Sequence, residues 1–199
     1  NMLLRAAVGR SRPGPYRQRG TSGLGSPVPA PDGLKDLTHL AADVLDRIPV
    51  KLRRFMTDQR PFEFRPVEQT RLDDPSPQPP VKHVWIRAVD AMPDGLDLHQ
   101  NLLAYVSDFE LLATSTLPHA LSFTRGNVIL ASLDHALWFH RRFRMDEWLL
   151  YSMESPNAGG ARGYTRGQFF TQDGTLVAST TQEGLIRVVD PAKARERSN

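Results

Sequence analysis

Two polar side chains occupy positions that the surrounding sequence marks as apolar, which makes them the first candidates for chemistry. Asp108 falls in a segment of helical apolar periodicity, one turn from Tyr105 and from Leu111. A carboxylate is costly to bury there unless it is hydrogen-bonded or faces a wet pocket. Gln182 shares the inner face of an alternating segment with aliphatic residues. An amide in that place is either a satisfied structural group or part of a site, and the structural alternative is the commoner one.

A second group of polar residues, Ser132, Asp134 and His135, has the residue types of a serine hydrolase. No Gly-x-Ser-x-Gly elbow surrounds the serine. Neighbours on a strand point to opposite faces, so Asp134 and His135 cannot form a relay, and structural roles are favoured for both. His135 and His140 also face opposite ways, and no cysteine is present, so we expect neither a zinc site nor a cofactor.

A long helix and a strand are expected to position these side chains. The helix would run from Leu98 to about Thr114, with Asp97 as N-cap and Gln100 at the capping-box position. Its apolar residues cover most of the circumference, which predicts a buried helix.

Strand patterns dominate the rest of the folded part. Before the helix, Asp36 could cap a helix over 37–47, Phe62–Arg71 is rich in strand formers, and Val81–Val89 alternates well. After it, strands are expected over 127–139, 147–154, 161–171 and 175–189, the last two joined by a turn at Gln172-Asp173-Gly174. A long buried helix followed by antiparallel strands predicts an α+β domain whose sheet wraps the helix.

Charge is distributed unevenly along the 199 residues. The formal net charge is +3, but residues 1–31 hold five arginines and no acidic residue, which leaves 20 basic against 22 acidic residues in the remainder. The basic character therefore belongs to a Gly- and Pro-rich leader, which we expect to be irregular or disordered. No basic helix or aromatic-basic pattern supports a nucleic-acid partner. The expected organisation is a leader over 1–31, a helical linker over 32–61, a domain over 62–189 and a flexible tail over 190–199.

Compartment and solubility follow from simple features. The apolar runs are only a few residues long, which predicts no membrane span. The absence of cysteine is compatible with a reducing compartment, and no secretory signal is visible. We therefore expect a soluble, cytoplasmic protein.

Five segments in constant order carry a resemblance to a known family. They read YVSDFELL over 105–112, ASLDHALWFHRRF over 131–143, DEWLLYSME over 146–154, GGARGYTRG over 159–167 and FTQDGTLVASTTQEGLIR over 170–187. Together they resemble the C-terminal half of the type II acyl-CoA thioesterases, the medium- and long-chain acyl-CoA hydrolases of bacteria and peroxisomes. The resemblance extends roughly from Pro29 to Val189.

The resemblance implies a fold, a reaction and a site. Each polypeptide of that family is two fused hot-dog units, and an Asp, a Thr or Ser, and a Gln activate the hydrolytic water. The matching positions here are Asp108, Ser132 and Gln182. The implied function is hydrolysis of a medium- or long-chain acyl-CoA to fatty acid and CoA by direct water attack. Basic groups for the CoA phosphates are not readable, although Arg141, Arg142 and Arg162 are candidates.

The resemblance also leaves alternatives open. It covers one hot-dog unit, whose uncovered sheet edge and apolar face predict self-association into a homo-oligomer. One alternative to the hydrolase is a catalytically impaired acyl-CoA-binding or assembly domain. Another is a hot-dog hydratase, which is disfavoured because the Asp/His pairing of such lyases is not evident.

Overall fold

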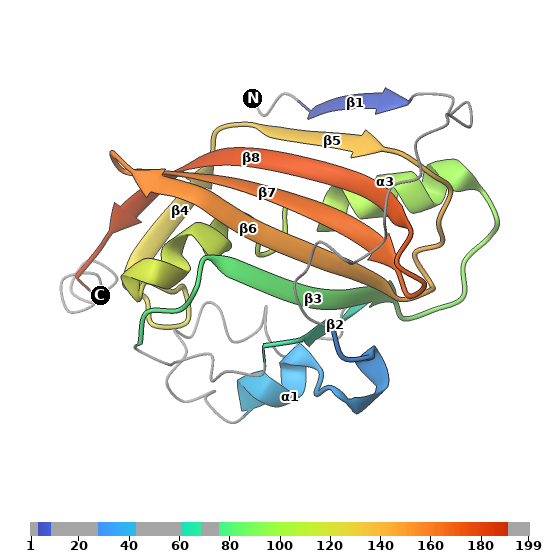
Figure 1. Cartoon of the computed structure of the whole chain (residues 1–199), viewed down its shortest axis with the longest axis horizontal. Helices are drawn as coiled ribbons and strands as arrows, with labels where there is room; N and C mark the ends of the chain where they lie inside the picture. The colour runs from blue at the N-terminus through green and yellow to red at the C-terminus, as the bar shows by residue number, and fades with distance from the viewer. Residues whose placement is uncertain (1–3, 9–27, 43–60, 69–75, 191–199) are drawn as a thin grey trace, which may run out of the picture.

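The computed structural model describes residues 4–8, 28–42, 61–68 and 76–190, of which 4–8 and 40–42 are described by their backbone alone. Its strands form one sheet in the spatial order β1-β5-β8-β7-β6-β3-β2, and β4 also pairs with β8 (Figure 1). The strands are β1 (Leu4–Val8), β2 (Phe62–Pro66), β3 (Val81–Ala88), β4 (Val128–Ser132), β5 (His135–Phe139), β6 (Leu149–Gly159), β7 (Arg162–Thr171) and β8 (Leu176–Val188). The β1–β5 pair is parallel and the other pairs are antiparallel.

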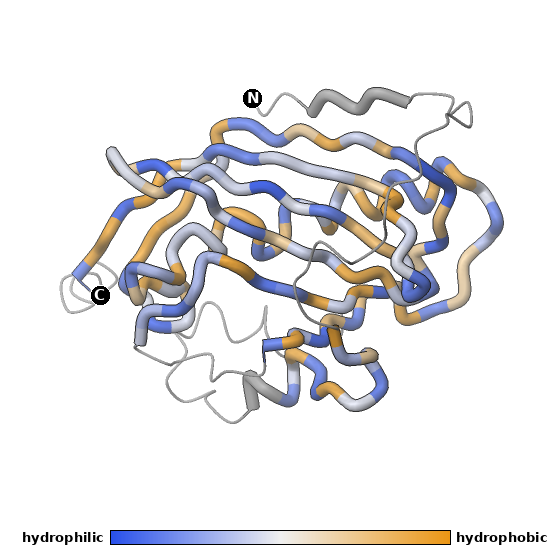
Figure 2. The backbone as a smooth tube through the Cα atoms, in the orientation of Figure 1, coloured by the Kyte–Doolittle hydropathy of each residue, from blue (hydrophilic) through white to orange (hydrophobic). Residues whose placement is uncertain are grey.

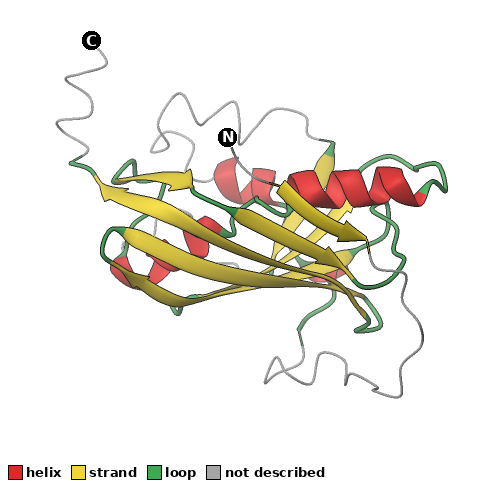
Figure 3. Cartoon of the chain, turned by 90° about the horizontal axis from the view of Figure 1, so that it is seen from above, coloured by secondary structure: helices red, strands yellow, loops and turns green. Residues whose placement is uncertain are grey.

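The longest helix, α3 (Leu96–Val106), lies along one face of the curved sheet (Figure 3). The shorter helical elements are the 3-10 helices η2 (Pro31–Gly33) and η4 (Leu112–His119) and the helix α1 (Leu37–Ala42). Within the described residues, no helix combines the length and the hydrophobicity needed to cross a bilayer. The predicted α+β class is confirmed.

Apolar side chains pack in two clusters, one on each face of the sheet. Hydrophobic residues accordingly occur in short stretches on many strands (Figure 2). The larger cluster lies between the sheet and α3 and includes Leu103, Val106 and Tyr151. The smaller cluster, on the other face, is built around Trp85 and Trp148 and is joined by partly buried residues of the 28–34 segment. Strand alternation explains the division, since successive side chains point to opposite faces.

Two paired glycines allow η4 to lie directly on the sheet. Gly163 of β7 stands opposite Gly184 of β8 in register. A Cβ on Gly163 would meet Ser115 Oγ at 2.3 Å, and one on Gly184 would meet Leu112 Cδ2 at 2.1 Å. The absence of side chains at this pair therefore lets the chain that follows α3 pack against β7 and β8, close to Gln182.

Several predicted elements match the structure. The turn over Gln172-Asp173-Gly174 joins β7 and β8, with Gly174 at a positive φ of 83°. Asp36 caps α1 by accepting a hydrogen bond from the Thr38 N–H at 2.7 Å. The predicted continuation of that helix to Arg47 lies outside the described residues.

The predicted helix over 98–114 is wrong in its extent, its cap and its burial. The α-helix ends at Val106, Gly95 is the N-cap, and Asp97 makes no capping hydrogen bond. Leu98 and Tyr105 are exposed by 40% and 73%, so only one side of the helix is buried. Termination has a local cause: the Ser107 hydroxyl donates to the Ala104 carbonyl, and Glu110 adopts a left-handed φ of 64°.

Two further predictions differ from the structure. The single strand expected over 127–139 is divided into β4 and β5. Within the leader expected to be irregular, Leu4–Val8 forms β1, hydrogen-bonded to β5. The segment before the expected start at Asp32 also contacts the domain, because the Pro29 carbonyl accepts from the Trp85 indole N–H at 2.9 Å.

Candidate functional site

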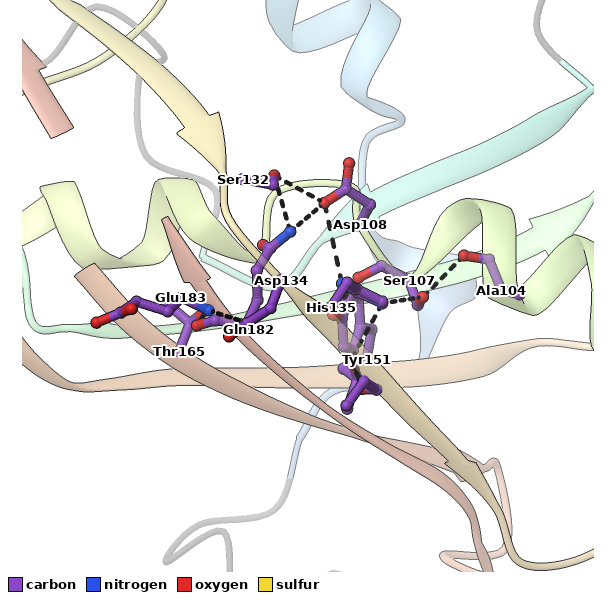
Figure 4. A network of polar contacts seen from close by, with 12 residues as sticks. Ala104, Ser107, Asp108, Ser132, Asp134, His135, Tyr151, Thr165, Gln182 and Glu183 are labelled. Carbon is purple, nitrogen blue, oxygen red and sulfur yellow. Dashed lines mark hydrogen bonds and ion pairs between the residues drawn. The ribbon is translucent and has the colours of Figure 1, made fainter. Parts of the chain in front are cut away.

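The structure brings the side chains of Asp108, Ser132 and Gln182 into one hydrogen-bonded group (Figure 4). The Gln182 amide nitrogen donates to Oδ1 of Asp108 and, at 2.9 Å, to the hydroxyl oxygen of Ser132. The Ser132 hydroxyl lies 3.4 Å from the same Asp108 oxygen, which it can donate to. Three segments far apart in sequence therefore converge on one carboxylate oxygen.

Asp108 reaches the site because α3 ends just before it. Ser107 is the C-cap, and its own carbonyl accepts a 2.6 Å hydrogen bond from the buried Tyr151 hydroxyl. Asp108 is thus carried on a turn whose first residue is fixed to the sheet, rather than on a helix face as predicted. Its side chain is 48% exposed, so the carboxylate remains in contact with solvent without leaving the group.

Gln182 supplies the buried half of the site. It lies on β8, is 0% exposed, and is paired in register with Thr165 of β7. Its amide nitrogen faces Asp108, since the reverse orientation would set the amide oxygen against a carboxylate oxygen. The amide oxygen, Oε1, is buried and finds no hydrogen-bond partner among the described residues.

A β-bulge between β4 and β5 aims both Ser132 and His135 at Asp108. The N–H groups of Leu133 and Asp134 both point to the Glu183 carbonyl, at 2.9 and 3.4 Å. The register changes by one residue across this point, from Ser132 opposite Gly184 to Ala136 opposite Thr181. Because side chains alternate, residues three apart would face opposite sides in a regular strand, and the extra residue places them on the same side.

His135 also lies beside the site, although the residue pattern predicted only a structural role for it. Its side chain is 1% exposed, and its Nδ1 lies 4.0 Å from Oδ1 of Asp108. Its Nε2 lies 2.8 Å from the Ser107 hydroxyl and 3.2 Å from the Thr180 hydroxyl. Burial lowers the pKa of His135 below its ordinary value, an effect that the charges of Asp108 and Asp134 oppose. Only the bulge, which cannot be read from periodicity, turns this residue toward Asp108.

Asp134 makes no hydrogen bond to His135 among the described residues, so the two do not form a serine-hydrolase relay. Its Oδ1 accepts a 2.7 Å hydrogen bond from the Glu183 N–H, which fastens the bulge to β8 beside Gln182. Among the basic candidates for CoA phosphates, Arg162 lies 3.5 Å from the Glu183 carboxylate and Arg141 donates to the Leu176 carbonyl. No group of three or more metal-ligating side chains occurs in the part of the chain that is described.

Comparisons with known proteins identify the family and the fold of the chain. Residues 52–185 match the model of the acyl-CoA thioesterase family. The chain is 37% identical over 160 residues to acyl-CoA thioesterase 2 of Haemophilus influenzae, a match that covers 80% of this chain and 56% of that protein. It is 35% identical to the crystal structure of the acyl-CoA thioesterase II TesB2 from Mycobacterium marinum, with a TM-score of 0.65 over 90% of this chain and 60% of that one.

A more distant structure supports the fold alone. A conserved protein with a hot-dog fold from Alicyclobacillus acidocaldarius superposes with a TM-score of 0.61 at 16% identity, covering 90% of this chain and 60% of that one. The expected hot-dog fold is thereby confirmed. The chain spans little more than half the length of these relatives.

Proposed function

Because the chain belongs to the acyl-CoA thioesterase family, we propose that it hydrolyses the thioester of an acyl-CoA by direct attack of water activated at Asp108. The observation that carries the proposal is the convergence of Gln182 and Ser132 on one oxygen of a half-exposed carboxylate. Gln182 and Ser132 hold Oδ1, which orients the carboxylate. The other oxygen, Oδ2, points away from Gln182 (Figure 4) and is the proposed acceptor for a water proton.

The reaction balances within this group. Asp108 takes one proton from the attacking water while the water oxygen bonds to the thioester carbonyl carbon. The tetrahedral intermediate then collapses, the carbon–sulfur bond breaks, and the thiolate of CoA receives the proton that Asp108 holds. Ser132 and Gln182 fix the carboxylate in one orientation, which removes the entropic cost of orienting it at each turnover. No acyl-enzyme forms in this scheme, since water itself is the nucleophile.

Release of free CoA from a medium-chain acyl-CoA tests the proposal. We expect measurable release by the wild-type chain and a loss of at least about 100-fold in kcat for Asp108→Asn, because an amide cannot take the water proton. Asp97→Asn is the matched control, since Asp97 is an exposed residue of α3 that makes no capping bond. Equal activity of the wild type and Asp108→Asn would overturn the assignment of Asp108.

The second candidate function is that of an acyl-CoA-binding or assembly domain, and exposed apolar residues are the reason to test it. Tyr105 and Leu98 lie on the outer side of α3, and Ile129, Leu133 and Trp138 are exposed on β4, the bulge and β5. Burial of these side chains against a second copy would remove them from water, so the proposal includes self-association of the chain. It also includes a cytoplasmic location, with which the absence of cysteine is compatible. Acyl-CoA binding without CoA release would replace the hydrolase by the binding domain. A folded monomer in sedimentation at micromolar concentration would contradict self-association.

A further inference from the structure

His135 lies directly behind the site and touches both of the segments that carry it. The imidazole is almost fully buried, and Figure 4 shows it beside Ser107. Its Nε2 lies within hydrogen-bond distance of the hydroxyls of Ser107 and Thr180. Ser107 immediately precedes Asp108 in the chain, and Thr180 precedes Gln182 by two residues on the same face of β8. One side chain therefore bridges the end of α3 and the strand that supplies the amide.

The neighbouring hydroxyls determine which ring nitrogen carries the proton. The Ser107 hydroxyl donates to the Ala104 carbonyl at 2.9 Å, and the Thr180 hydroxyl donates to the Ala136 carbonyl at 2.8 Å. Each hydroxyl has a single hydrogen, so both present lone pairs to the imidazole. The Nε2 of His135 is therefore the donor, and the neutral ring keeps its lone pair on Nδ1. Lowering of the pKa of His135 by burial agrees with a neutral ring.

The remaining nitrogen faces the catalytic carboxylate. Nδ1 is buried without a hydrogen-bond partner among the described residues, and it lies 4.0 Å from Oδ1 of Asp108. An unprotonated Nδ1 offers no hydrogen to the carboxylate, so Oδ1 of Asp108 accepts from Gln182 and Ser132 instead. The two nitrogens of the ring therefore have different roles. Nε2 bonds the end of α3 to β8, and Nδ1 does not compete with Gln182 and Ser132 for Oδ1 of Asp108.

We propose that His135 is a positioning residue of the hydrolytic site, whose Nε2–H, shared between Ser107 and Thr180, sets the placement of Asp108 relative to Gln182. The inference rests on the proposed function. It goes beyond the three residues proposed to activate water, because His135 is almost fully buried and acts through Asp108 and Gln182.

Two substitutions at His135 separate this role from simple packing. Glutamine places its amide nitrogen near the position of Nε2, whereas asparagine reaches only the position of Nδ1. We expect His135→Gln to keep kcat within about threefold of the wild type, and His135→Asn to lower kcat by about 10- to 100-fold with little change in KM. His99→Gln is the matched control, since His99 is equally buried and bonds the Met145 N–H away from the site. Its kcat should stay unchanged even if its melting temperature falls.

A spectroscopic measurement tests the same role without relying on turnover. The nitrogen chemical shifts of His135 in the neutral protein should show a protonated Nε2 and an unprotonated Nδ1, and Ser107→Ala with Thr180→Val should change the Nε2 resonance. A proton on Nδ1 overturns the inference, as does an active wild type in which His135→Gln is as slow as His135→Asn. An inactive wild type with the expected shifts instead contradicts the proposed function and leaves the hydrogen bonds of His135 supported.

Discussion

The amide nitrogen of Gln182 donates to Oδ1 of Asp108 across 74 residues of sequence. This contact joins the turn after α3 to the last strand of the sheet, and it places a fully buried amide against a half-exposed carboxylate. The pair therefore combines rigidity on one side with access for water on the other.

Replacing Gln182 by methionine should separate activity from stability. The substitution keeps the shape of the side chain but removes the donor to Asp108 and Ser132, so we expect kcat to fall by about 100-fold through misplacement of the carboxylate. It also removes the buried Oε1, which has no hydrogen-bond partner among the residues that the structure describes, so the free energy of unfolding should stay equal or rise by about 1 kcal/mol. CoA release and urea unfolding measure the two effects. A large loss of stability would show that the amide is primarily structural.

Substitutions at Ser132 should distinguish the hydroxyl from the backbone that carries it. Ser132→Ala removes the group that accepts from Gln182 at 2.9 Å, and we expect about a tenfold lower kcat. Ser132→Thr retains the hydroxyl and should remain within about threefold of the wild type. Steady-state kinetics on one acyl-CoA compares the three proteins. If alanine and threonine behave alike, the hydroxyl has no part in turnover.

Asp134 should affect the site through the bulge. Its Oδ1 holds the Glu183 N–H at 2.7 Å, so Asp134→Ala should lower the free energy of unfolding by about 1 kcal/mol and reduce kcat, because both Ser132 and Gln182 adjoin this contact. Asp134→Asn keeps an acceptor oxygen and is the control. Thermal unfolding and CoA release measure the outcome, and an alanine variant with wild-type kcat would separate the bulge from catalysis.

The buried His135 should make stability depend on acid. Its pKa in the folded chain lies below the ordinary value of 6.5, since burial disfavours the charged ring. As pH falls below about 6.5 the unfolded chain binds the proton first, so the free energy of unfolding decreases until the folded chain is protonated as well. Above that pH the contribution is complete and constant. His135→Gln should show a shallower decrease in urea unfolding between pH 7 and pH 5, about where an ordinary histidine titrates.

His140 does not affect the comparison between the wild type and His135→Gln, although burial and Arg141 also lower the pKa of His140. It is present in both the wild type and His135→Gln, so its effect cancels in the difference. Identical pH profiles for the two proteins would contradict a depressed pKa at His135.

The ring of Tyr151 is closely packed, so a substitution that displaces it should lower the free energy of unfolding. A Cβ on Gly167 would lie 2.4 Å from its ring, and the ring is held by a stack on Phe169 with centroids 3.9 Å apart and by the bond from its hydroxyl to Ser107. Gly167→Ala should therefore destabilise the fold by about 1–3 kcal/mol. Gly159→Ala is the control, because its Cβ would meet nothing within 4 Å. Urea unfolding of both variants measures the difference.

Much of the fold could be predicted from the sequence because it depends on local patterns. Alternation located β3, β6, β7 and β8 to within a few residues, and the Gln172-Asp173-Gly174 turn followed from residue types alone. The end of α3 could not be predicted, because an unbroken apolar pattern continues past Val106. A single hydroxyl bond from Ser107 and the left-handed Glu110 stop the helix, and neither interrupts the pattern of hydrophobic residues.

The candidate site was predictable in part for a similar reason. Periodicity marked Asp108 and Gln182 as polar residues in apolar surroundings, and resemblance supplied Ser132. The position of His135 beside Asp108 could not be predicted, because the segment 127–139 reads as one regular strand. An irregularity of one residue, fixed by hydrogen bonds to Glu183, reverses the direction of every side chain that follows it.

That bulge also determines which spacings in the sequence place two side chains on the same face of the strand. Ser132 and His135 are three positions apart and both face Asp108, which only a strand with one surplus residue allows. Deleting Leu133 would restore a regular ladder and turn one of the two away, while every residue named in the site would still be present in the sequence. In the proposed site the spacing between Ser132 and His135 is therefore as necessary as the residues themselves, and a chain that retained both residues but not the spacing would lose the arrangement around Asp108.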